Sequence, residues 1–149
     1  KYDERVFKMR CLGLDLGSKT LGIAISDRTN LIASVYKTIF FKDEDYSSLI
    51  EPLREIINNE EIGTLVLGLP KNMNNSLGTR AMITLEFKEL LENSFSLPVV
   101  MEDERFTSVI SNNILISANV SRNKRKKKVD GMAAEIILQG YLDKIRKGN

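Results

Sequence analysis

The side chains of this sequence that are suited to catalysis are carboxylates. Asp15 lies inside the apolar run "LGLDLGSKTLGIAISD", where an unpaired carboxylate would be costly. Asp103 and Glu104 follow the apolar stretch "LPVVM", and Asp130 begins a helical pattern. The chain has no histidine, which excludes Ser–His–Asp and Cys–His catalysis and imidazole-bound zinc. Carboxylates that converge without histidine favour a hard divalent cation of the Mg²⁺ kind and phosphoryl chemistry.

Positive charge is concentrated in one short segment. The net charge is only +2, yet "SRNKRKKK" at 121–128 carries six of the 22 basic residues. Such a block indicates a local anionic partner. Like charges repel and bury little apolar surface, so we expect 122–128 to be a mobile loop that binds nucleic-acid phosphates and leads into Asp130.

The elements that position these residues follow from hydrophobic periodicity. Three strands are expected at 11–17, 21–27 and 32–41, and buried strands at 64–70 and 97–103. Helical spacing marks 49–57, 83–91, 106–114 and 133–145. A meander followed by alternating helices and strands predicts an α/β fold, with a mixed five-stranded sheet flanked by helices. We expect one domain over 9–149, preceded by an extension at 1–8.

Alternation along the first two strands gives the sheet a bulky face and a face of small residues. The bulky set is Leu12, Leu14, Leu16, Leu21, Ile23 and Ile25. The small set is Cys11, Gly13, Asp15, Gly22, Ala24 and Ser26. The small face admits the last helix, whose stripe is Asp130, Ala134, Ile137 and Tyr141. If Ala134 packs on Gly13 and Ala24, Asp130 arrives near Asp15.

Four segments, in order, resemble the YqgF (RuvX) family of pre-16S rRNA nucleases and Holliday junction resolvase-like proteins. They are "LGLDLGSKTLGIAISD", "VLGLPKNMN", "LPVVMEDERFTS" and "VSRNKRKKKVDGMAAEIILQGYLD". The resemblance runs from about residue 9 to residue 143. It implies a ribonuclease H-like fold with sheet order 3-2-1-4-5 and strand 2 antiparallel. It also implies metal-dependent phosphodiester hydrolysis in maturation of the 5′ end of 16S rRNA.

The resemblance also assigns roles to particular residues. Asp15, Glu104 and Asp130 match the catalytic acids that would bind Mg²⁺ or Mn²⁺, with Asp103 as the alternative to Glu104. The residues expected to contact nucleic acid are Lys19, Lys71, Asn72, Arg105, Arg122, Lys124, Arg125, Lys126, Lys127 and Lys128.

Other functions stay open at this point. Four-way DNA junctions are an alternative substrate, and a non-catalytic RNA-binding module is an alternative function. An actin–hexokinase-type ATPase also carries "DLGS", but it needs two such domains, more than 149 residues supply. A single cysteine, Cys11, excludes an internal disulfide and fits a reducing cytoplasm. No apolar run approaches the roughly 20 residues of a membrane helix, so we expect no membrane partner. We also expect the protein to be cytoplasmic, as a monomer or a homodimer.

Overall fold

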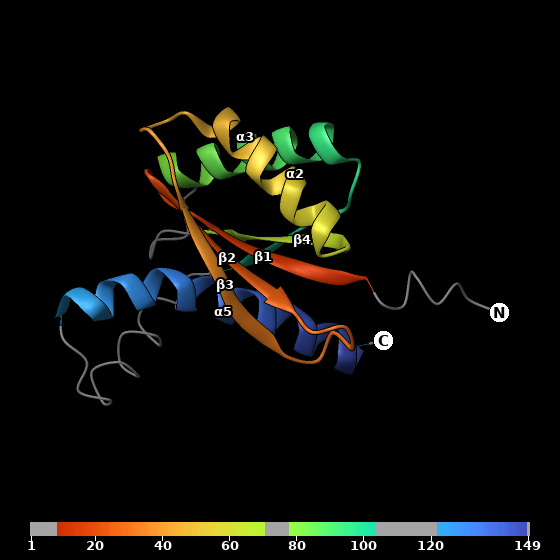
Figure 1. Ribbon diagram of the computed structural model, residues 1–149. Coiled ribbons are helices and arrows are strands. Elements are labelled where there is room, and N and C mark those ends of the chain that lie inside the picture. Colours follow the sequence, from red (N-terminus) through yellow and green to blue (C-terminus); the bar gives the residue numbers. More distant parts are fainter. Residues whose placement is uncertain (1–8, 71–77, 104–121, 149) are drawn as a thin grey trace.

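A computed structural model of the protein describes residues 9–70, 78–103 and 122–148, with the backbone alone described for 122–130 and 148. Figure 1 shows a central sheet between two layers of helices. The elements in chain order are β1 (Arg10–Leu16), β2 (Thr20–Ser26), β3 (Ala33–Phe40), the 3-10 turn η1 (Tyr46–Leu49), α2 (Ile50–Asn59), β4 (Ile62–Leu69), α3 (Thr79–Phe95), β5 (Val99–Asp103) and α5 (Arg122–Gly148).

The sheet has the order β3-β2-β1-β4-β5, as predicted. β2 is antiparallel to both β1 and β3, whereas β4 is parallel to β1 and β5 is parallel to β4. The β1–β2 hairpin closes tightly, with the Gly17 N–H donating to the Thr20 carbonyl at 2.7 Å. β1 is therefore the central strand, and its last residues lie at the same edge as the ends of β4 and β5.

The predicted bulky and small faces of the sheet are both confirmed. Helices α2 and α3 cover the bulky face, and α5 covers the small one (Figure 1). The fully buried centre of the first layer is Leu12, Leu14, Leu21, Ile23, Leu49, Leu53, Leu65, Leu67 and Leu91. The layer under α5 is smaller and consists of Cys11, Ala24, Ala33, Val66, Ala134, Ile137, Leu138 and Leu142. Small residues on the strands let this one helix lie close to the sheet.

The predicted loop at 122–128 is wrong. The backbone of this segment is helical, and α5 runs without interruption from Arg122 to Gly148. Asp130 therefore does not open the helix but lies more than two turns inside it, at about 3.6 residues per turn. Lysine and arginine are good helix formers, and the packed part of α5 provides a template from which the helix extends backwards. Figure 1 shows the start of α5 projecting past the edge of the sheet.

Two other expectations fall outside the described residues. The helix predicted at 106–114 and the extension at 1–8 both lie there. Within the part of the chain that the structure describes, no helix is long and apolar enough to cross a membrane.

Candidate functional site

Of the expected catalytic acids Asp15, Glu104 and Asp130, Asp15 is the one whose side chain the structure describes. It is the penultimate residue of β1, the central strand, and it lies opposite Gly22 of β2. Its strand phase places it with Cys11 and Gly13 on the face that α5 covers. The side chain is half-buried.

The direction of α5 brings Asp130 toward Asp15. Ala134 lies over Gly13, and Tyr141 lies about two turns further along the helix, near Cys11. Burial raises the pKa of the Tyr141 hydroxyl, and the nearby Cys11 thiol raises it further. The helix therefore runs antiparallel to β1. Four helical residues span about 6 Å and two strand residues about 7 Å, so the backbone of Asp130 reaches the level of Asp15.

The end of β5 places Asp103, one of the two acids that the sequence left as alternatives. Val99 and Met101 pack into the core under α2 and α3, so Asp103 shares their phase and lies on that face. Asp15 lies on the opposite face. This disfavours Asp103 as a partner of Asp15. Glu104, the other alternative, is outside the described residues.

Glu102 is an acid that sequence reasoning overlooked. Its side chain is buried under α5, where both carboxylate oxygens accept hydrogen bonds from Lys144 Nζ at 3.0 Å. Gly140 lies beside it, because a Cβ atom there would be 3.7 Å from Glu102 Oε2. The alternation along β5 could have predicted that Glu102 is covered by α5, because Val100 and Glu102 lie on the same face of the strand. This ion pair ties the second half of α5 to the edge strand.

Arg80 is the second residue that sequence reasoning missed. It lies in the first turn of α3, and its Nη2 donates a 2.5 Å hydrogen bond to the carbonyl oxygen of Leu16, the last residue of β1. Its side chain is half-buried. A guanidinium group is thus fixed to the backbone of the residue after Asp15, from the face of the sheet opposite to the Asp15 side chain. Only the folded chain shows this, because the two residues are 64 positions apart.

The structure describes some of the residues that the sequence predicted to contact nucleic acid. Lys19 is exposed in the turn between β1 and β2, at the Asp15 end of the sheet. The basic segment 122–128 forms the first turns of α5, which project at the same end (Figure 1). Lys71, Asn72 and Arg105 lie outside the described residues.

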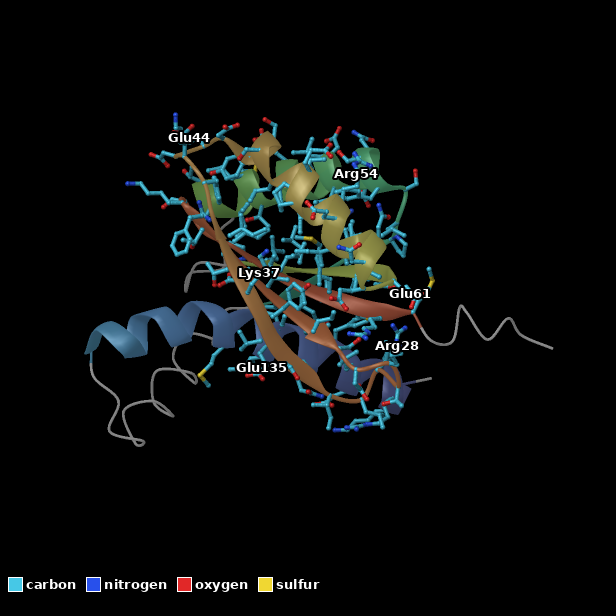
Figure 2. All side chains as sticks on the ribbon, in the orientation of Figure 1. Arg28, Lys37, Glu44, Arg54, Glu61 and Glu135 are labelled. Atoms are coloured by element: carbon cyan, nitrogen blue, oxygen red, sulfur yellow. The ribbon has the colours of Figure 1, made fainter. Side chains whose placement is uncertain are left out.

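Charged side chains at the opposite end of the sheet pair with one another on the surface. Arg28 and Glu61 lie side by side there and form an exposed ion pair of 2.8 Å (Figure 2). Among the residues with described side chains, no three acids, cysteines or histidines form a group able to hold a metal ion. A metal at the Asp15 end would therefore need ligands from beyond that set, such as Glu104 and Asp130.

Comparison with known proteins shows the family of the chain. A family model described as RuvX, Holliday junction resolvase, matches residues 9–144. The chain belongs to the RuvX family. A relative from Geobacillus sp. (strain WCH70), named "Putative pre-16S rRNA nuclease", is 50% identical over 135 residues, which cover 91% of this chain and 98% of the relative. A protein of the same name from Bacillus subtilis (strain 168) is 46% identical over 137 residues, 92% of this chain and 99% of that one.

Solved structures confirm the fold of this RuvX family member. RuvC of T. thermophilus, in complex with a Holliday junction substrate, superposes with a TM-score of 0.58 at 13% identity, over 94% of this chain and 96% of that one. The Fowlpox virus resolvase, also with Holliday junction DNA, gives a TM-score of 0.54 at 15% identity, over 93% and 100% of the two chains. The predicted ribonuclease H-like fold is therefore confirmed.

Proposed function

We propose that this protein is a metal-dependent nuclease that hydrolyses phosphodiester bonds in the 5′ region of pre-16S rRNA. The observation that carries the proposal is the position of Asp15: a half-buried carboxylate at the end of the central strand, on the face covered by α5. Relatives 46–50% identical over nearly their whole length bear the name of such a nuclease, which supports rRNA as the substrate. We infer that the protein acts in the cytoplasm, where such a precursor rRNA would be met.

Asp15, Glu104 and Asp130 would hold Mg²⁺ or Mn²⁺. Carboxylate oxygens are the donors that these hard cations prefer, and a half-buried carboxylate gains more from a bound cation than an exposed one does. A bound divalent cation would supply an activated water molecule and stabilise the leaving oxygen. The close packing of α5 on β1 would set the height of Asp130 relative to Asp15.

Basic residues around this end of the sheet would hold the substrate backbone. Lys19 flanks Asp15 in the following turn, and the basic segment of α5 starts two turns before Asp130. We assign the same role to Lys71, Asn72 and Arg105. Contacts to phosphates fix the position of a nucleic acid without reading its bases, so shape and charge would select the substrate.

A cleavage assay tests the proposal. End-labelled structured RNA from the 5′ region of pre-16S rRNA is incubated with the wild type, Asp15→Asn and Glu61→Gln, with Mg²⁺, with Mn²⁺ or with EDTA. We expect wild-type cleavage that EDTA stops, none by Asp15→Asn, and normal cleavage by Glu61→Gln. The control also removes one carboxylate charge, but at the opposite end of the sheet (Figure 2).

Three outcomes would overturn the proposal. Wild-type turnover by Asp15→Asn would place the site elsewhere. Binding of the RNA without cleavage in any metal would make the protein a non-catalytic RNA-binding module. Cleavage of a four-way DNA junction in the same assay, with the RNA left intact, would make it a junction resolvase.

A further inference from the structure

We propose that Arg80 binds a phosphate group of the nucleic acid substrate while its hydrogen bond to Leu16 holds the end of β1 in place. This inference rests on the proposed function, because the phosphate is that of the substrate. It adds a residue outside the basic segments that the sequence singled out.

The first argument is location. Arg80 Nη2 is 2.5 Å from the carbonyl oxygen of Leu16, which directly follows Asp15 in β1. The guanidinium is therefore anchored at the end of the sheet that carries Asp15, which it reaches from α3 on the face opposite to the Asp15 side chain. The peptide carbonyl that it binds belongs to the strand that carries Asp15, so Arg80 also limits the movement of that strand end.

The second argument is charge. No carboxylate in the described part of the chain forms an ion pair with Arg80. Arg10, Arg28, Arg54 and Arg146, in contrast, each have a carboxylate within 3.4 Å. A half-buried guanidinium whose contact is a neutral carbonyl keeps a net positive charge, which an incoming anion would neutralise.

The third argument is donor capacity. A guanidinium has five N–H donors in a fixed planar fork, and the fork matches the oxygens of a phosphate. Leu16 accepts from one nitrogen, Nη2. Among the described residues, Leu16 is the only hydrogen-bond acceptor of this guanidinium, so its other donors are available there for phosphate oxygens. The backbone of Arg80 is itself well fixed, since its carbonyl accepts a 2.8 Å hydrogen bond from the Thr84 hydroxyl.

The test measures binding separately from cleavage. All variants are made in the Asp15→Asn background, and the dissociation constant for a fluorescently labelled RNA hairpin is measured over a range of salt concentrations. Arg80→Met removes both the charge and the hydrogen bond. Arg80→Gln keeps one neutral donor for Leu16, and Arg80→Lys keeps the charge. Arg54→Met, on the exposed face of α2, is the matched control.

If Arg80 contacts a phosphate, Arg80→Met and Arg80→Gln should each reduce the steepness of the salt dependence. The slope of the logarithm of the RNA-binding constant against the logarithm of the salt concentration should change by about 0.7–0.9. Arg80→Lys and the Arg54→Met control should both keep the wild-type slope. If Gln behaves like the wild type, or if the Met variant loses thermal stability without a change in slope, Arg80 is only a structural brace and the inference is wrong. Because binding is measured without turnover, a failure of the proposed nuclease activity would appear in the cleavage assay and not here.

Discussion

A Cβ atom added to Gly13 would lie 2.7 Å from the Cβ atom of Leu138. It would also lie 2.9 Å from the carbonyl oxygen of Ala134, so the clash involves the backbone of α5 as well as a side chain. The absence of a side chain at this position of β1 is what lets α5 approach the sheet. The same approach sets the height of Asp130 relative to Asp15.

Gly13→Ala should therefore destabilise the protein, because α5 must move away from β1. Overpacking of this kind costs about 1–3 kcal/mol in the free energy of unfolding, measured by urea denaturation. Gly140→Ala is the matched control in the same interface. Its nearest contact would be an ordinary 3.7 Å, and alanine favours a helix, so stability should be unchanged or raised. Equal stability of Gly13→Ala and the wild type would contradict the close packing.

Lys144→Met should also destabilise the fold, because it leaves the buried Glu102 carboxylate without its cation. An unsatisfied buried acceptor costs about 1–3 kcal/mol, here toward the lower end since the Lys144 side chain is 68% exposed. Adding Glu102→Gln should recover part of that loss, because a neutral amide is less costly to bury than a charge. Urea denaturation of the two single variants and the double variant measures the coupling. Independent, additive effects would show that the ion pair contributes nothing.

Stability in acid should depend on Asp27. Its carboxylate accepts hydrogen bonds from the N–H of Ile32 at 3.0 Å, from the Thr29 hydroxyl and from the N–H of Leu31 at 2.9 Å. These bonds, with that of Ile32 the largest contributor, lower the pKa of Asp27 from 3.8 to about 2. Since the folded state favours the charged form, this contribution is complete above about pH 4 and disappears as the pH falls toward 2.

Asp27→Asn should therefore weaken the pH dependence of unfolding over that interval. Asp43→Asn, in the exposed segment after β3, is the control and should keep the wild-type profile. An acid profile of Asp27→Asn that matches the wild type would show that the turn does not hold the charged carboxylate.

The thiol of Cys11 should be unreactive in the folded protein. Burial raises the pKa of Cys11 to about 11, although hydrogen bonds with Ser26 and Thr64 oppose this shift. Only the thiolate reacts with disulfide reagents, so labelling should be slow at neutral pH and fast once urea unfolds the chain. The measurement is the labelling rate against urea concentration. Rapid labelling without denaturant would mean that α5 leaves the sheet often.

The basic segment of α5 should bind substrate as a helix. Replacing Lys126, Lys127 and Lys128 with alanine preserves helix propensity and removes three charges. Binding of structured RNA should weaken, and the salt dependence should fall by up to about 0.7–0.9 log units per lost phosphate contact. The control replaces Arg146 and Lys147, in the last turn of the same helix. Superimposable titrations of the triple variant and the wild type would show that these lysines are only a solvated surface.

The sequence by itself determined the sheet and its two faces. The alternation in β1 and β2 is local, with a period of two, so it predicted which residues are bulky and buried and that Asp15 lies on the side of small residues. The stripe of α5 then predicted that Ala134 packs on Gly13, because the small face could accept a helix.

The tertiary structure alone decided the contacts between distant residues. Glu102 and Lys144 are 42 positions apart and Arg80 and Leu16 are 64 apart, so no local pattern pairs them. The start of α5 was decided in the same way. Repulsion among the charges of 122–128 favours a loop in isolation, but a helix already packed on the sheet supplies the nucleus from which these good helix formers continue.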